Sequence, residues 1–336
     1  MSDFGEALKR LVSGATLDAE ESAAAFGAIM RGEVSQAQMA AFLTGLAMRK
    51  PSVDEVVGAV RAMRGAMETI RAPAGAIDVC GTGGDGVGTL NVSTAVAFVV
   101  AGCGVPVAKH GNRSMSSQTG AADVLEQLGV RIDLEPARAE ACLAETNFCF
   151  LFAPQYHPAI KHVAPVRRAL GFRTIFNLIG PLSNPAGVQR QLLGVFSRDW
   201  IEAIAAVLRE LGTEAAWVVH SADGMDEISC AAPTHAAELS NGELTLRDIE
   251  PQDGGLPRAP LSAIRGGTAA ENARAIRDLL SGVHSAFRNV VLLNAAAALI
   301  VAEKATDLKN GVDLAAAAID RGRAADILAR TAAFPG

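Results

Sequence analysis

Short apolar runs of strand length alternate with longer alanine- and leucine-rich runs through the middle of this 336-residue chain. The strand-like runs are residues 76–80, 105–108, 148–152 and 217–220. Runs of helix length, such as 137–146 and 201–211, lie between them. Strands that alternate with helices form mostly parallel sheets with helices on their faces. The sequence therefore predicts an α/β domain with a mostly parallel central sheet, and the pair Asn241-Gly242 predicts a hairpin attached to it.

The first 71 residues lack this alternation and have helical features throughout. Ser35 and Ser52 each have Gln or Glu three residues later, which is the spacing of a capping box at a helix start. Apolar residues between 39 and 46 then recur at the spacing of one helical face. The segment RAPAG, residues 71–75, contains proline and glycine, which interrupt helices, and precedes the first expected strand. We therefore expect an all-helical domain over residues 1–71 and a larger α/β domain over residues 72–336.

Composition excludes several classes of protein. A net charge of −6 argues against nucleic acid as the main partner. No apolar run reaches the ~18 residues of a membrane span, and the first ten residues carry Asp3 and Glu6 instead of a signal-peptide pattern. The five cysteines form no C-x-x-C pair, which favours buried free thiols in a reducing cytoplasm over zinc or redox motifs.

A glycine-rich loop follows the first expected strand, in the stretch DVCGTGGDGVGTLNVST at residues 78–94. Its G-x-G-x-x-G spacing fits a dinucleotide fold, but that fold needs an acidic residue ~20 positions later. Residues 86–122 contain no Asp or Glu, although 36 of the 336 residues are acidic. A P-loop fails as well, because no Gly-Lys-Ser/Thr closes the run. The loop suits a polyanion instead, since glycine lets backbone N–H groups approach phosphate and Asn91 can cap the next helix.

Two more polar segments follow expected strands. The segment KHGNRSMSS, residues 109–117, supplies charge and hydroxyl groups without an acid, and ligands bind at the carboxyl ends of strands in such sheets. Asp226 and Glu227 follow the strand 217–220, and carboxylates with ligand phosphates suit Mg²⁺. Arg167 and the histidines at 157 and 162 look ordinary on the residues alone, because neither set has a catalytic or metal-binding spacing.

Taken together, these motifs resemble the anthranilate phosphoribosyltransferase family almost end to end. The segments that carry the resemblance are GTGGD (81–85), NVST (91–94), KHGNRSMSS (109–117), RTIFNLIGPLSNP (173–185), GMDEIS (224–229) and LNAAAALIVA (293–302). The resemblance implies transfer of the 5-phosphoribosyl group from phosphoribosyl pyrophosphate (PRPP) to the amine of anthranilate, a step of tryptophan biosynthesis. It also implies a fold of the nucleoside phosphorylase type, helices from about 160–185 joined to the helical domain, and a cytoplasmic homodimer formed through that domain.

The resemblance further assigns residues to each ligand. PRPP would contact Gly81, Gly84, Asp85, Thr89, Asn91, Val92, Ser93, Thr94, Lys109, His110, Gly111, Asn112, Arg113, Ser114, Ser116, Ser117 and Ala121. Anthranilate would contact Gly81, Asn112, Arg167, His110 and His157. Two Mg²⁺ ions per active site would be held by Ser93, Asp226 and Glu227. No general base is assigned, because the weakly basic amine of anthranilate needs positioning more than deprotonation.

The sequence departs from the family at one assigned contact: Ala121 stands where a serine is common, so one hydroxyl contact to PRPP is missing. Two alternatives stay open. A pyrimidine nucleoside phosphorylase of the same fold would leave the segment 109–117 unexplained. A non-catalytic, nucleic-acid-binding paralogue is disfavoured by the intact motifs and the net negative charge.

Overall fold

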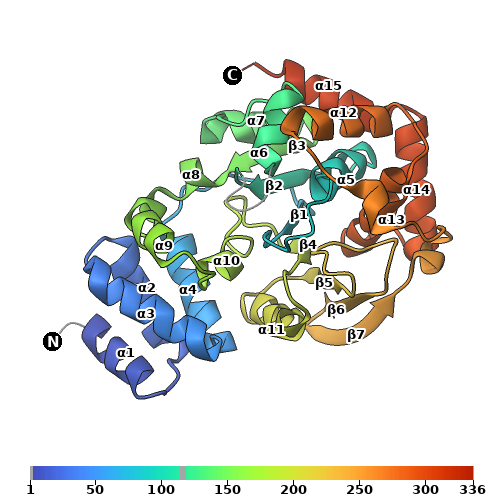
Figure 1. Ribbon diagram of the computed structural model, residues 1–336. Coiled ribbons are helices and arrows are strands. Elements are labelled where there is room, and N and C mark those ends of the chain that lie inside the picture. The colour runs from blue at the N-terminus through green and yellow to red at the C-terminus, as the bar shows by residue number, and fades with distance from the viewer. Residues whose placement is uncertain (1–2, 114–118, 336) are drawn as a thin grey trace.

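The computed structural model describes residues 3–113 and 119–335. A helical part formed mainly by the N-terminal residues lies beside a larger α/β part (Figure 1). The N-terminal helices are α1 (Asp3–Val12), α2 (Ala19–Met30), α3 (Gln36–Arg49) and α4 (Val53–Gly65). The prediction of helices is confirmed up to Gly65, whereas the following residues to 71 are not helical.

The α/β part is built on one seven-stranded sheet in the order β3-β2-β1-β4-β5-β6-β7. Its strands are β1 (Ile77–Gly81), β2 (Val107–Gly111), β3 (Phe148–Phe152), β4 (Arg190–Gly194), β5 (Ala215–Ser221), β6 (Thr234–Ser240) and β7 (Glu243–Ile249). Strands β1 to β5 pair in parallel with their neighbours, whereas β6 pairs in antiparallel fashion with both β5 and β7. The predicted mostly parallel sheet and the hairpin at Asn241-Gly242 are therefore confirmed. Strand β4 was not predicted, and β2 begins two residues later than expected.

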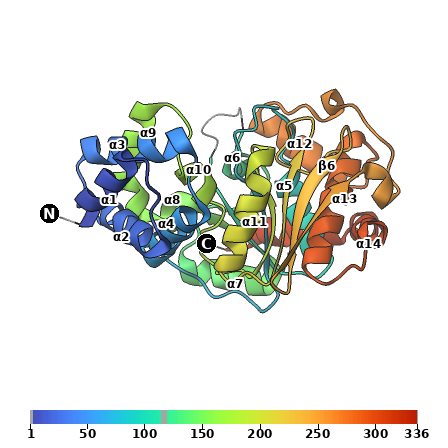
Figure 2. The ribbon, with the colours of Figure 1, turned by 90° about the horizontal axis from the view of Figure 1, so that it is seen from below.

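Helices cover both faces of this sheet. The helices after β1 are α5 (Val92–Gly102), α6 (Ala121–Gln127), α7 (Pro136–Thr146), α8 (Ala153–Tyr156), α9 (Ala164–Leu170), α10 (Phe176–Ile179), α11 (Ile201–Glu210), α12 (Ala269–Leu280), α13 (Ala286–Val301), α14 (Leu308–Asp320) and α15 (Arg323–Ala333), of which α9 and α10 pack in the helical part. Single 3₁₀ turns lie at Pro158–His162, Arg198–Trp200, Pro251–Gly254 and Leu261–Ile264. Figure 2 shows α11 on the side of the sheet toward the helical part and α13 and α14 on the far side.

One face of the sheet lies in a single hydrophobic core, and the other face is divided between two, one at β2 and β3 and one at the remaining strands. In β5, Trp217 and Val219 pack with α5 and α13, whereas Ala216 and Val218 pack with α11 and the helical part. This alternation follows from the two-residue period of a strand. The parallel strands β1–β5 are thus buried on both sides, as expected for a parallel sheet, whereas the edge strand β7 is mostly exposed.

Helices from the middle of the chain complete the helical part. Val166 of α9 and Phe176 and Ile179 of α10 lie in the same core as α1–α4. The rings of Phe26 and Phe176 meet edge to face, with centroids 5.9 Å apart. This packing supports our proposal that residues 1–71, joined by helices from about 160–185, form one domain and that the rest of residues 72–336 forms the other.

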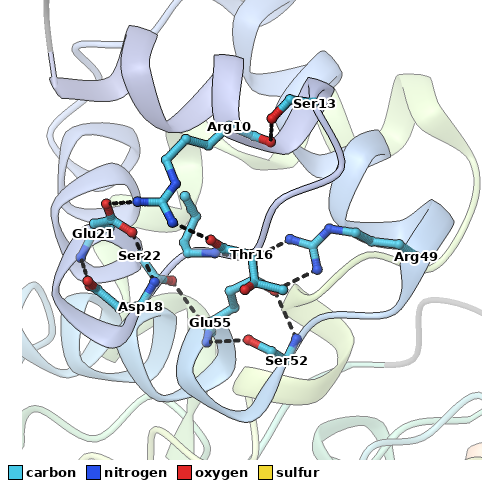
Figure 3. Close-up of polar contacts among 10 residues, drawn as sticks. Arg10, Ser13, Thr16, Asp18, Glu21, Ser22, Arg49, Ser52 and Glu55 are labelled. Carbon is cyan, nitrogen blue, oxygen red and sulfur yellow. Dashed lines mark hydrogen bonds and ion pairs between the residues drawn. The ribbon is translucent and has the colours of Figure 1, made fainter.

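A buried acid holds the helical part together (Figure 3). Glu55 in α4 is fully buried and forms an ion pair with both terminal nitrogens of Arg49. Its carboxylate also accepts the N–H of Leu17 at 2.9 Å and the N–H of Ser52 at 2.8 Å. The predicted capping boxes at Ser35 and Ser52 are both confirmed. Within the described residues, no helix is long and apolar enough to cross a membrane.

Candidate functional site

The site lies where the order of the sheet reverses. From β1 the chain goes to β2 and β3 on one side, and then returns to β4 on the other side of β1. Ligands of open α/β sheets bind at the carboxyl ends of the two strands that flank such a point. Here those ends are Gly81 of β1 and Gly194 of β4, which are paired in register.

Asp226 packs directly against both glycines. A Cβ atom on Gly81 would lie 2.4 Å from the Asp226 Oδ2 atom, and one on Gly194 would lie 1.5 Å from the Asp226 carbonyl oxygen. Any side chain at either position would displace the acid, so glycine is required at both. Gly81 was predicted as a site residue, whereas Gly194 was not.

Three acids, Asp85, Asp226 and Glu227, lie close together at this point. Asp226 Oδ2 accepts the N–H of Gly83 at 2.9 Å, and Glu227 Oε1 accepts the N–H of Ser93 at 3.1 Å. Burial raises the pKa of Asp226, and the charge of Asp85 raises it further. Burial and the charge of Asp226 likewise raise the pKa of Glu227. The cluster therefore favours a bound cation.

The side chain of Lys109 is the cation held inside this cluster. It is 1% exposed, and its Nζ atom donates to the carbonyl of Val79 at 2.6 Å and to Ser93 Oγ at 3.1 Å. Its charge lowers the pKa values of Asp78 and Glu227 against the larger effect of burial. Lys109 thus offsets part of the negative charge and orients the Ser93 hydroxyl.

The remaining donors fit Mg²⁺ held together with a substrate. Ser93 offers a hydroxyl and Asp226 and Glu227 offer carboxylates, and Mg²⁺ is bound in proteins by one or two carboxylates plus phosphate oxygens and water. Among residues 3–113 and 119–335, no group of three or more His, Cys, Asp or Glu side chains is arranged to hold a metal by itself. This donor set matches a cation that arrives with a phosphorylated ligand.

The glycine loop has the conformation that its residues permit. Gly83 and Gly84 have φ angles of +65° and +75°, a region that other residues rarely adopt. Asp85 Oδ1 accepts the N–H of Val87 at 3.1 Å, which closes a tight turn. Thr89 pairs with Arg265 in an isolated antiparallel bridge. The far end of the loop is therefore fixed by a segment that lies 176 residues later in the sequence.

The start of α5 differs from its prediction. Asn91 is the N-cap residue, but its side chain makes no capping hydrogen bond, so that prediction is wrong. Its Oδ1 atom instead accepts from Asn272 Nδ2 at 2.8 Å. Val92 and Thr94 of the first turn are buried, and Thr94 Oγ1 has no hydrogen-bond partner within the described residues.

Two predicted histidines meet beside this cluster. The Nε2 atoms of His110 and His157 are 3.2 Å apart, so one ring donates to the other. Burial lowers the pKa of His110 to about 3 and that of His157 to about 4, and both rings are neutral at neutral pH. Gly111 follows His110 and leaves room for the Phe150 ring, which would be 2.8 Å from a Cβ atom there.

The rest of the basic segment is only partly placed. Asn112 Oδ1 accepts the N–H of Arg113 at 2.7 Å. The guanidinium of Arg113 forms ion pairs with Asp123 at 2.8 Å and Glu126 at 2.6 Å, so its charge is already compensated. Ala121 is the first residue of α6. The predicted contacts Ser114, Ser116 and Ser117 lie outside the described residues.

Arg167 lies in the helical part, apart from the acid cluster. Its Nη2 atom is 3.5 Å from Asn177 Oδ1, and its guanidinium lies 5.6 Å from the centre of the Phe176 ring. Burial lowers the pKa of Arg167. A half-buried guanidinium of this kind can bind the carboxylate of a ligand.

Two buried residues beside the site, Asp78 and Asn184, were not predicted as functional from the sequence. Asp78 of β1 accepts from Asn184 Nδ2 at 2.8 Å and from the N–H of His110 at 3.3 Å. Burial raises the pKa of this carboxyl to about 6. The one signal in the sequence is an acid inside an apolar strand-like run, which is rare without a partner.

Arg173 was also missed as a contact. It precedes α10, and its Nη2 atom donates to the carbonyl of Gly84 in the glycine loop. Its guanidinium lies 4.4 Å from the centre of the Phe196 ring. The segment that leads into the helical part thus touches the loop of the α/β part.

Comparison with known proteins agrees with this architecture. Residues 5–67 match the helical bundle domain of the glycosyl transferase family, and residues 74–325 match its a/b domain. The fold and the site thus define a two-domain glycosyl transferase. The chain is 55% identical to an anthranilate phosphoribosyltransferase of Rhodopseudomonas palustris (strain BisB5), over 98% of each chain.

Solved structures give the same result. The crystal structure of anthranilate phosphoribosyltransferase from Thermus thermophilus is 42% identical, covers 99% of both chains and superposes with a TM-score of 0.93. The enzyme from Saccharomyces cerevisiae in complex with PRPP and Mg is 27% identical, covers 98% of this chain and 96% of its own, and has a TM-score of 0.89. The chain belongs to the anthranilate phosphoribosyltransferase family.

Proposed function

We propose that this protein transfers the 5-phosphoribosyl group of PRPP to the amine of anthranilate. The products are N-(5-phosphoribosyl)anthranilate and pyrophosphate, and the step belongs to tryptophan biosynthesis. The observation that carries the proposal is the cluster at the ends of β1 and β4, where Asp226 packs on Gly81 and Glu227 bonds to Ser93. Full-length similarity to enzymes of this name supports the same reaction.

PRPP is assigned to the glycine loop, the start of α5 and the basic segment after β2. The positive φ angles of Gly83 and Gly84 leave the backbone of the loop open to phosphate oxygens. The first turn of α5 adds the helix dipole and the hydroxyl of Thr94, which has no hydrogen-bond partner among residues 3–113 and 119–335. We propose two Mg²⁺ ions per site, held by Ser93, Asp226 and Glu227. Mg²⁺ bound there supplies positive charge to the pyrophosphate leaving group.

Anthranilate is assigned to the side of the site that Arg167, His110 and His157 form. Arg167 would hold its carboxylate in a charge-assisted pair. The two neutral histidines present hydrogen-bonding groups without a charge, which suits a neutral aromatic amine. Positioning the amine against the ribose carbon is then the main contribution of the chain's own residues.

The proposal includes a homodimer formed through the helical part and a cytoplasmic location. Val12 at the end of α1 and Met48 in α3 are 80% and 84% exposed, and such apolar side chains on the helical part favour contact with a second copy. All five cysteines are free, which suits a reducing compartment.

The deciding experiment mixes the protein with PRPP, Mg²⁺ and anthranilate and follows the loss of anthranilate fluorescence. We expect turnover that requires all three and releases one pyrophosphate for each anthranilate consumed. Phosphorolysis of pyrimidine nucleosides without turnover of anthranilate would contradict the proposal, as would binding to DNA at physiological salt without either activity.

A further inference from the structure

Asn294 in α13 holds the backbone that follows the acid pair. Its side chain is fully buried. The Nδ2 atom donates to the carbonyl of Ile228 at 2.7 Å, and the Oδ1 atom accepts the N–H of Ile228 at 2.9 Å. One carboxamide thus satisfies both backbone groups of one residue, while Nδ2 also donates to the carbonyl of Val290 at 2.8 Å.

Ile228 is the residue directly after Glu227, in a segment without helix or strand. Buried backbone groups in such a segment need partners outside regular secondary structure. The next residue is fixed too, because Ser229 N–H donates to Thr234 Oγ1 at 3.1 Å and Ser229 Oγ donates to Asp223 at 2.6 Å. The backbone that follows the acid pair is therefore fixed by side chains, while the absence of a side chain at Gly81 and Gly194 makes room for Asp226 itself.

We propose that Asn294 is a positioning residue for the carboxylates of Asp226 and Glu227. Like charges close together repel each other, so the backbone that carries them must be fixed if both are to face the bound Mg²⁺. The two bonds from Asn294 do this at the residue adjacent to Glu227. The inference rests on the proposed function, since it gives Asn294 a role in binding the cation that accompanies PRPP.

The test replaces Asn294 by leucine and, separately, by serine. Asn294→Leu keeps the approximate shape of the side chain and removes both bonds to Ile228. Asn294→Ser leaves one hydroxyl and room for a water molecule, so it keeps part of the clamp. The matched control is Arg288→Met on the same helix, because Arg288 is 3% exposed and pairs with Asp320 at 2.7 Å, away from Ile228.

Two measurements are made on each folded variant. Binding of Mn²⁺ in the presence of PRPP and without anthranilate is followed by electron paramagnetic resonance, and the Mg²⁺ concentration for half-maximal turnover is measured by steady-state kinetics. Loss of a residue that supports metal ligands typically weakens metal binding 10- to 100-fold. We expect about tenfold weaker Mn²⁺ binding in Asn294→Leu, a smaller loss in Asn294→Ser, and an unchanged anthranilate KM in both.

The control separates this role from a structural one. Arg288→Met should lower the thermal midpoint and leave Mn²⁺ binding unchanged. Wild-type Mn²⁺ affinity in the folded Asn294 variants, or an equal loss in Arg288→Met, would overturn the proposal. If the wild-type protein bound Mn²⁺ and PRPP but failed to consume anthranilate, the proposed reaction would be wrong, and the comparison of Mn²⁺ affinities would still decide the role of Asn294.

Discussion

The helical part and the α/β part each bury acids, and they treat those acids in opposite ways. Glu55 in the helical part accepts from Arg49, Leu17 and Ser52, so its charge is paired and its oxygens are satisfied (Figure 3). Asp226 and Glu227 lie near a third acid, Asp85. Burial raises the pKa of both, and the charge of Asp85 adds to the shift of Asp226 as that of Asp226 adds to the shift of Glu227. A buried acid with its own cation indicates a structural role, whereas buried acids that lack one indicate a place for a ligand.

The largest effect is expected from removal of the uncompensated charges. The double variant Asp226→Asn, Glu227→Gln should lower kcat about a thousandfold, because cation binding at the leaving group contributes several kcal/mol. Without Mg²⁺ its urea midpoint should equal or exceed that of the wild type, since the repulsion between the acids is gone. A variant with near-normal kcat, or one that unfolds at a markedly lower urea concentration, would contradict the interpretation that these two acids bind a ligand and do not stabilise the fold.

Glu55, the buried acid that is paired with Arg49, should affect stability and leave catalysis unchanged. Glu55→Gln leaves Arg49 without its counterion and should lower the free energy of unfolding by about 3 kcal/mol, measured by urea denaturation. The KM values for both substrates should stay unchanged. The matched control is Arg10→Gln, which removes the exposed pair between Arg10 of α1 and Glu21 of α2 in the same helical part and should lower stability by less than about 1 kcal/mol. A shift in either KM for Glu55→Gln would show that the network also shapes the site.

A variant of Arg167 tests whether a half-buried charge without a counterion among the described residues also indicates a ligand-binding site in the helical part. A charge-assisted pair contributes about 1.5–3 kcal/mol, so Arg167→Ala should raise the anthranilate KM roughly tenfold or more and leave the PRPP KM nearly unchanged. The neighbouring Arg168 is exposed, and Arg168→Ala should change neither value. If the PRPP KM rose instead, Arg167 would belong to the phosphate site.

The smallest effect is expected from a neutral group. Ala121→Ser restores the hydroxyl that relatives commonly carry at the start of α6, and it adds at most one hydrogen bond to PRPP. We expect the PRPP KM to fall by less than roughly tenfold, with kcat and the anthranilate KM unchanged. Steady-state kinetics with PRPP varied at saturating Mg²⁺ give the answer. If the wild type bound no PRPP and Ala121→Ser restored binding, this neutral contact would matter as much as the charges do.

The part of the site that follows from the order of the strands along the chain could be predicted from the sequence. Parallel strands end at the same edge of a sheet, so the carboxyl-terminal parts of β1 and β2 and the segment after β5 had to converge, and Gly81, Lys109 and Asp226 do so. The capping boxes at Ser35 and Ser52 were predicted because their bonds join residues only three positions apart.

The residues that were missed act over long sequence separations. Asn294 bonds to a residue 66 positions away, and Asn184 bonds to Asp78 across 106 positions. Such single side-chain bonds leave no periodic pattern, and neither does the close approach that requires Gly194. Strand β4 was missed for a different reason: it begins with two polar residues, the partly buried Arg190 and the buried Gln191, whose hydrogen-bond partners come from other parts of the fold.

The helical part takes α9 and α10 from residues 164–179, inside the stretch of sequence that also forms the sheet. A fragment that ended at residue 71 would contain α1–α4 with part of their apolar core exposed to water. The remaining fragment would contain α9 and α10 without the helices against which they pack. Recombination at that boundary therefore exchanges neither domain intact. The two domains must be inherited together, and an engineered swap of the helical part has to graft two separate segments at once.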